Sequence, residues 1–118
     1  MLSSEVLQKS RPTISVVDFS LAQIKQFLVE KLVDKNVESA YLVGSLATGT
    51  ASLWSDIDVV IVKETTTPFP DRAFEFAGLF DLGVAVDILV YTPDEFHRMD
   101  LDPTSFWKTA MQTKIKVL

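Results

Sequence analysis

Apolar residues recur every three or four positions in the first part of the chain. From Leu21 to Asn36 this spacing places apolar side chains on one face of an α-helix. Ser20 or Asp18 can begin that helix, because a serine or aspartate oxygen accepts hydrogen bonds from the free N–H groups of a first turn. We therefore predict an amphipathic helix that ends near Asn36.

A second amphipathic helix is predicted over residues 71–81. Phe74, Ala77 and Phe80 lie at helical spacing, and Gly83 can end the helix because glycine readily adopts the left-handed conformation of a C-terminal cap. The same spacing assigns most aromatic residues to the core: Phe74, Phe76, Phe80, Phe96, Phe106 and Trp107. Phe74 and Phe76 cannot share one helix face, so we expect at least one of them to be exposed.

Runs of β-branched and aromatic residues predict strands. They cover residues 41–43, 57–62 and 84–91, and residues 115–118 can add an edge strand. The run 57–62 is apolar almost without a break, which is typical of a strand buried on both faces. We therefore expect this strand at the centre of the sheet.

The order of these elements predicts an α+β fold with α/β character: a small mixed β-sheet with helices packed mainly on one face. Pro93 and Pro103 stand where two further helices can begin. A chain of 118 residues, 47% of them hydrophobic, fits a single domain over residues 1–118. Residues 1–17 are expected to form an N-terminal arm or helix that the pattern determines weakly.

The charge balance argues against stable nucleic-acid binding, because 11 basic residues face 16 acidic ones and leave a net charge of -5. The longest apolar run, Val59 to Val62, is far shorter than the roughly 20 residues of a membrane helix. No apolar leader precedes the domain, and the chain has no cysteine. We expect a cytoplasmic protein without a membrane partner.

Three aspartates lie inside or at the edge of the predicted strands. Asp56 and Asp58 flank Ile57, and Asp87 stands between two β-branched residues. Burial of a lone carboxylate is costly, and strand alternation puts Asp56 and Asp58 on one side, about 7 Å apart. If the strand of Asp87 is adjacent, three carboxylates converge and a divalent cation would offset their repulsion. Magnesium is the natural ion, because it prefers oxygen ligands and bridges to phosphates.

A turn of small residues precedes these acids. Gly44 and Ser45 follow the first predicted strand, where a glycine lets the backbone approach a ligand and the N–H groups of a helical turn suit a phosphate. Gly44 and Gly49 have the glycine spacing of a P-loop, but Thr50 and Ala51 replace its lysine and hydroxyl residue. A P-loop is therefore excluded.

Val43-Gly44-Ser45, then ten residues, then Asp56-Ile57-Asp58, with a later acid in Val86-Asp87-Ile88, resembles the nucleotidyltransferase superfamily related to DNA polymerase beta. The resemblance is greatest to its minimal nucleotidyltransferase (MNT) domains. It covers residues 20–91, and Gly49 and Ser55 also match that family.

The resemblance implies a function and a set of roles. Gly44 and Ser45 would hold a triphosphate, with Ser55 as an orienting hydrogen-bond group. Asp56 and Asp58 would bind Mg²⁺, two ions in all, and Asp87 would complete the metal site beside the acceptor hydroxyl. The reaction would be transfer of a nucleoside monophosphate, AMP from ATP, with release of pyrophosphate. Positioning and charge neutralisation would supply most of the catalysis.

The resemblance also bears on partners. Some MNT proteins of this size are antitoxins that transfer AMP to a helical HEPN ribonuclease toxin, so a HEPN-type partner or a homodimer is expected. Leu46 and Thr48 stand where relatives often carry arginines, and Lys63 is a candidate to supply the missing charge. Two alternatives stay open: transfer to a small molecule such as an aminoglycoside, and a module that binds nucleotide or toxin without turnover.

Two other residues have weaker functional interpretations. His97, the single histidine, lies beyond all the motifs among charged residues, and we expect it at the surface. Trp54 lies next to the acidic motif in a polar loop, where it could stack on a base or pack under the turn.

Overall fold

The computed structural model describes residues 12–101 and 105–118. Its sheet has four strands in the order β3-β2-β1-β4: β1 (Ser39–Val43), β2 (Ile57–Val62), β3 (Val86–Tyr91) and β4 (Ile115–Lys116). β2 pairs with β1 in antiparallel and with β3 in parallel orientation, and β4 pairs with β1 in antiparallel orientation. The predicted mixed sheet, the internal position of β2 and the edge strand are thus confirmed.

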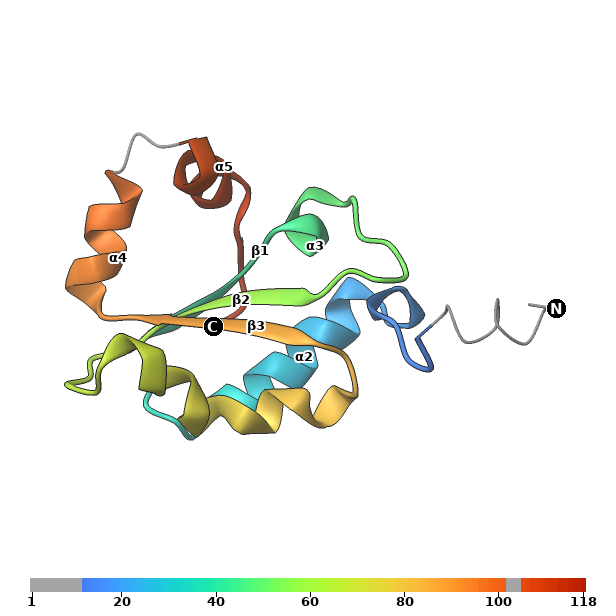
Figure 1. Cartoon of the computed structure of the whole chain (residues 1–118), viewed down its shortest axis with the longest axis horizontal. Coiled ribbons are helices and arrows are strands. Elements are labelled where there is room, and N and C mark those ends of the chain that lie inside the picture. The colour runs from blue at the N-terminus through green and yellow to red at the C-terminus, as the bar shows by residue number, and fades with distance from the viewer. Residues whose placement is uncertain (1–11, 102–104) are drawn as a thin grey trace, which may run out of the picture.

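Helices lie on both faces of the sheet (Figure 1). On one face are α2 (Leu21–Leu32) and the 3-10 segment η2 (Phe69–Leu82), and on the other are α3 (Ser45–Thr48), α4 (Pro93–Asp100) and α5 (Ser105–Thr113). The larger cluster of buried apolar side chains involves α2 and η2, and a smaller one involves α4 and α5. The larger core cluster therefore lies on the face of α2 and η2, and a smaller one lies on the opposite face.

The start of α2 follows from its cap. Ser20 Oγ accepts a hydrogen bond from the backbone N–H of Gln23, and Gln23 Oε1 accepts one from the N–H of Ser20. These reciprocal bonds satisfy donors that a helix start leaves free. The helix ends at Leu32, earlier than predicted, and Asn36 lies beyond it with a φ of 56°.

The segment before α2 is packed on the fold. Asp18 belongs to a short 3-10 turn, η1 (Val16–Asp18), and its carboxylate accepts a hydrogen bond from the N–H of Ser15. Ser15 is itself buried and donates its hydroxyl to the carbonyl of Leu53, 2.8 Å away. The rest of the predicted N-terminal arm, residues 1–11, lies outside the described residues, as does Pro103.

The prediction for the second helix was right in spacing and wrong in orientation. Phe76 and Leu79 are the buried side chains of η2, whereas Phe74 and Phe80 are 77% and 51% exposed. The backbone of η2 is kinked at Phe76, yet Phe74, Ala77 and Phe80 line one pocket, so Phe74 and Phe80 do share a face. That face points away from the core, because Phe76 fills the space on the core side. As predicted, η2 ends at Gly83, which has a φ of 86°.

Strand alternation sorts the β2 side chains between the two faces. Ile57, Val59 and Ile61 belong to the larger cluster, whereas Val60 belongs to the smaller one on the α5 side. Asp58 must therefore share the face of Val60. Among the described residues, no helix has both the length and the apolar character needed to cross a membrane.

Candidate active site

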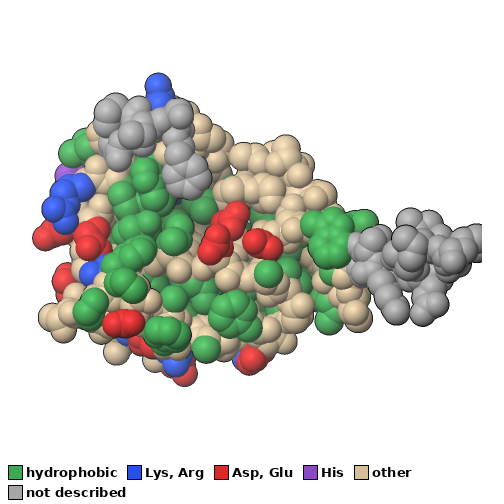
Figure 2. Space-filling model, in the orientation of Figure 1, with side chains coloured by type: hydrophobic (Ala, Val, Ile, Leu, Met, Phe, Trp, Pro, Cys, Tyr) green, Lys and Arg blue, Asp and Glu red, His purple; other side chains and the backbone are tan. Residues whose placement is uncertain are grey.

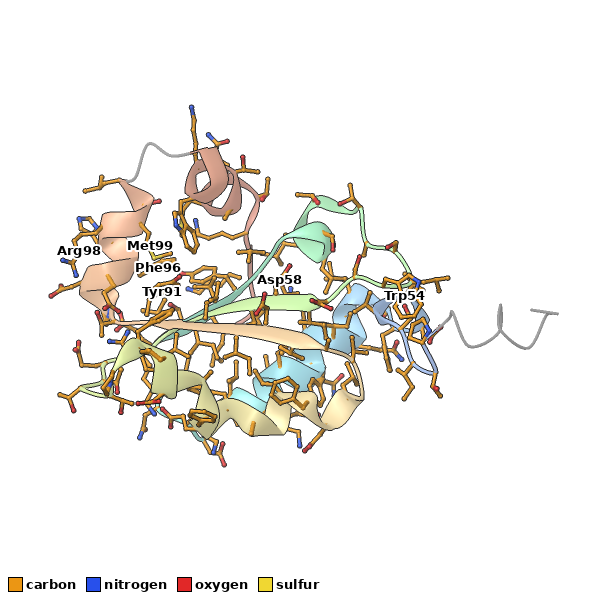
Figure 3. The ribbon with its side chains drawn as sticks, in the orientation of Figure 1. Trp54, Asp58, Tyr91, Phe96, Arg98 and Met99 are labelled. Carbon is orange, nitrogen blue, oxygen red and sulfur yellow. The ribbon has the colours of Figure 1, made fainter. Side chains whose placement is uncertain are left out.

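Asp58 and Asp87 are direct neighbours across two parallel strands. The register of β2 and β3 pairs their Cα atoms, and the register of β1 and β2 pairs Val43 with Asp58. Paired residues of adjacent strands point to the same face, so both carboxylates lie on the side of the sheet that carries α3 and α5. Figure 3 shows Asp58 rising from β2 on that side, and acidic side chains are visible at the centre of the face in Figure 2. The structure thus brings together two of the three predicted acids.

The electrostatic environment of Asp58 disfavours its charged form. Burial raises the pKa of the Asp58 carboxyl, and the negative charges of Asp87 and Asp56 raise that pKa further. A cation between these carboxylates would lower the electrostatic energy of the folded protein. Carboxylate oxygens are also the donors that hard divalent ions take.

Asp56 is placed differently. It precedes β2, is exposed, and lines a separate pocket with Trp54 and Ser55. Because the strand begins only at Ile57, the alternation that would align Asp56 with Asp58 does not apply to it. Within residues 12–101 and 105–118, no three histidine, cysteine or acidic side chains are arranged to hold a metal. The donor set fits a cation at Asp58 and Asp87, and Asp56 contributes charge from beside them.

Gly44 fits closely against this pair. Its φ of 72° and ψ of -150° are accessible in practice only to glycine. A Cβ atom on Gly44 would overlap with Asp58 Oδ2. The missing side chain therefore both permits the turn and leaves room for the carboxylate.

The turn continues directly into α3. The N–H groups of Ala47 and Thr48 donate to the carbonyl of Gly44, and the helix ends after one turn at Gly49. Ser45 and Leu46 come before these bonded amides, where a helix has no intrahelical acceptors for its N–H groups. These two amides are the donors that this turn can offer to an anion.

A pocket of about 600 Å³ lies over the carboxylates. Nine residues line it: Val43, Gly44, Thr48, Asp58, Asp87, Leu89, Thr109, Ala110 and Thr113. Its floor comes from the three adjacent strands, one wall from the turn and α3, and the other from α5. The volume falls in the range of about 300–1,000 Å³ found for small-ligand sites.

The α5 wall was missed by sequence reasoning. Thr109, Ala110 and Thr113 belong to the helix predicted after Pro103, and of these Ala110 is buried. No motif identifies them, because their place beside Asp58 depends on how α5 folds back over the sheet. None of the nine lining residues is a lysine or an arginine, in keeping with Leu46 and Thr48 at the expected arginine positions.

Ser55 and Trp54 lie outside this pocket. Ser55 Oγ accepts a hydrogen bond of 2.8 Å from the N–H of Ser52, and the Ser55 N–H donates to the Ser52 carbonyl. Ser55 therefore shapes the turn that leads into β2. Trp54 is 63% exposed and is seen near η1 and α2 in Figure 3.

Lys63 and His97 both lie away from the pocket over Asp58 and Asp87. Lys63 Nζ forms an ion pair of 2.8 Å with Glu75 and lies 5.7 Å from the ring centre of Phe76. This ion pair links the end of β2 to η2, on the face of the sheet opposite Asp58 and Asp87. Lys63 therefore does not replace the arginines that relatives often carry beside the triphosphate. His97 is exposed on α4, as expected, and lines a different pocket with Phe96.

Comparison with known proteins identifies the family. The model of the nucleotidyltransferase domain matches residues 21–117. A chain of a toxin–antitoxin complex solved with AMP-PNP has the same fold, with a TM-score of 0.58, 20% identity, and coverage of 80% of this chain and 72% of that one. A Sulfolobus solfataricus protein described as a nucleotidyltransferase gives a TM-score of 0.55, 22% identity, and coverage of 80% and 76%. No curated protein matches the sequence. The chain belongs to the nucleotidyltransferase domain family, and its enzymatic class is nucleotidyl transfer.

Proposed function

We propose that this nucleotidyltransferase moves AMP from ATP onto a hydroxyl group of a partner protein, with Mg²⁺ as cofactor. One observation carries the proposal: Asp58 and Asp87 are register neighbours on the floor of the pocket, and Gly44 packs against Asp58. Two close carboxylates beside a turn with free amides suit an anionic substrate that arrives with a divalent cation.

Asp58 and Asp87 are the residues that would hold the metal. When bound, Mg²⁺ supplies positive charge that offsets the repulsion between the carboxylates and the phosphates. Asp56 adds negative charge from the loop before β2 and thereby strengthens cation binding. Its exposed position leaves it free to turn toward the site once a cation is present.

The turn at Gly44 would receive the phosphates. The amides of Ser45 and Leu46 would donate to phosphate oxygens, and the Ser45 hydroxyl would add a further donor. Because none of the described residues that line the pocket is basic, the metal rather than arginine would carry most of the charge neutralisation. We therefore expect triphosphate affinity to depend steeply on Mg²⁺.

The chemistry is an in-line displacement at the α-phosphorus. The acceptor oxygen forms a bond to that phosphorus. The bond between the α-phosphorus and the oxygen that bridges to the β-phosphate breaks, and pyrophosphate leaves with that oxygen. The acceptor proton passes to Asp87 or to solvent. The role of the protein is to align these groups and to exclude water from the covered side of the pocket.

Adenosine and a protein acceptor are supported by the toxin–antitoxin neighbour, which was solved with an adenine nucleotide analogue. A helical HEPN-type toxin or a second copy of this chain would fill the acceptor role. The cytoplasmic location expected from the sequence stays a prediction.

The proposal is tested with purified protein, each of the four ribonucleoside triphosphates, Mg²⁺ and the protein encoded by the neighbouring reading frame. We expect pyrophosphate release and a mass gain of one AMP on that partner, with ATP preferred. Asp58→Asn should abolish the transfer, and Asp34→Asn, at an exposed aspartate far from the pocket, should leave it unchanged. Partner binding without turnover would favour a non-catalytic module, and transfer to an aminoglycoside alone would favour a small-molecule enzyme.

A further inference from the structure

A second, apolar pocket adjoins the carboxylates on the outer side of β3. It has a volume of about 280 Å³ and is lined mainly by Phe74, Ala77 and Phe80 of η2 and by Val86 and Ile88 of β3. Asp87 lines both this pocket and the larger one. Figure 2 shows hydrophobic side chains gathered below the acidic ones on this face. We call these five apolar residues the β3-edge surface.

The exposed members of this surface lie on η2, whereas Val86 is buried and Ile88 packs against the core. η2 already buries Phe76 and Leu79 on its inner side, yet it also leaves Phe74 77% and Phe80 51% exposed. Full burial of a phenylalanine is worth about 1.5–3 kcal/mol. Two such side chains beside one groove are typical of a binding surface.

The adjoining strand has an open edge. Among the residues that the structure describes, β3 is the last strand of the sheet, and the carbonyls of Ala85 and Tyr91 accept hydrogen bonds from the β2 side. Backbone groups alternate in direction along a strand, so those of Val86 and Ile88 point away from β2. An extended segment of another protein can pair with them.

The charge around this edge selects the partner. Residues 69–88 contain four carboxylates and one basic residue. Glu75 pairs with Lys63 and Asp81 with Lys31, and the basic residue, Arg72, is held by Glu95 at 2.6 Å. Asp71 and Asp87 have no ion-pair partner among the described residues. A second copy of this chain would bring like charges together, whereas a segment with lysine or arginine would be attracted.

We propose that the β3-edge surface docks an extended, basic and apolar segment of the acceptor protein as an added strand, an inference that rests on the proposed function. Side chains of such a strand alternate in direction. Those beside Val86 and Ile88 would contact Phe74 and Phe80, and the one beside Asp87 would face the nucleotide pocket. Docking at this edge therefore delivers a hydroxyl to the reacting site.

The probe is a short synthetic peptide in which valine alternates with threonine, with one central tyrosine in the threonine series and lysines at both ends. We expect it to bind the wild-type protein, measured by fluorescence anisotropy, and a glutamate-ended version to bind at least ten times more weakly. The double variant Phe74→Ser with Phe80→Ser should weaken binding at least tenfold. Val33→Ser, at a 67% exposed valine of the α2 end, is the matched control and should have no effect.

Hydrogen exchange gives a second readout. Peptide binding should slow exchange at the amides of Val86 and Ile88 and leave Asp87 and Leu89 unchanged, because only the former point outward. Absence of peptide binding, or an equal loss in the Val33 control, would overturn the docking proposal. So would a wild-type dimer that Phe74→Ser converts to monomer, since a second copy would then be the occupant.

Nucleotide measurements separate this proposal from the proposed function. AMP-PNP binding should be the same in the wild type, the double variant and the control. With ATP and Mg²⁺ the tyrosine of the docked peptide should gain the mass of one AMP. A peptide that docks as described but never gains AMP would leave the docking surface standing and overturn its role in delivering the acceptor.

Discussion

Gly44 and Asp58 are packed so closely that a single methyl group on the glycine would overlap with Asp58 Oδ2. The glycine also has a φ of 72°, so Gly44→Ala combines a steric overlap with backbone strain of about 1–3 kcal/mol. We expect this variant to be destabilised by about 2–4 kcal/mol in urea unfolding and to lose AMP-PNP binding in calorimetry.

Gly49→Ala is the matched control for that variant. Gly49 has a φ of 76°, but nothing lies within 4 Å of a Cβ placed there. It should therefore show the backbone cost alone, about 1 kcal/mol, with nucleotide binding retained. If both variants lose the same stability and the same AMP-PNP affinity, the contact between Gly44 and Asp58 is not needed for nucleotide binding.

Removal of the charge at Asp58 should separate stability from activity. Burial and two neighbouring carboxylates raise the pKa of Asp58, so its ionised form costs the folded state free energy. In metal-free buffer near neutral pH, Asp58→Asn should be as stable as the wild type or more stable, by up to about 1 kcal/mol. Transfer should fall at least about 100-fold. A clear loss of stability together with normal turnover would remove Asp58 from the mechanism.

An ion pair between η2 and α4 gives an expectation for pH dependence. Arg72 Nη1 donates to Glu95 Oε1 at 2.6 Å and to the Val90 carbonyl, and Glu95 also accepts from the N–H of Thr92. The hydrogen bond from Arg72, with the one from the Thr92 backbone, lowers the pKa of Glu95. The folded state thus binds this proton less tightly than the unfolded state, whose glutamate has a pKa of about 4.5.

Glu95→Gln should therefore cost about 1–2 kcal/mol at pH 7. The difference from the wild type should shrink as the pH falls below the unfolded pKa and through the lowered folded one, where the wild-type carboxylate is protonated too. Urea unfolding at several pH values measures this, with the exposed Glu64→Gln as control. If the difference in unfolding free energy between the wild type and Glu95→Gln does not change with pH, the loss comes from packing and not from the charge of Glu95.

The alternation of residues explains what the sequence could predict. The almost continuous apolar run of β2 indicated an internal strand. The acids within β2 and β3 suggested neighbours on one face, and the register pairs Asp58 with Asp87. Their chemical roles stay predictions. Asp56 is close enough for its charge to raise the pKa of Asp58, but it precedes the strand, so its orientation depends on a loop that no periodicity describes.

Two further features depend on tertiary packing. Spacing alone could not tell which of two apolar faces of η2 is buried, because Phe76 and Leu79 compete with Phe74 and Phe80 at the same three-residue period. The position of α5 over the carboxylates follows from the pairing of β4 with β1, a long-range contact between short strands. Neither has a local sequence signal.

The α5 wall offers a steric test of where the nucleotide binds. Thr109 lines the large pocket, and Gln112 lies on the same helix, is exposed and does not line that pocket. Thr109→Trp should fill part of the space above Asp58 and weaken AMP-PNP binding at least tenfold in calorimetry. Because Thr109 is itself exposed, its substitution should change the free energy of unfolding by no more than about 0.5 kcal/mol. Gln112→Trp adds the same bulk outside the pocket and should bind as the wild type does. If both tryptophan variants bind normally, the nucleotide does not occupy the space between α5 and the strands, and the pocket over Asp58 and Asp87 is not its site.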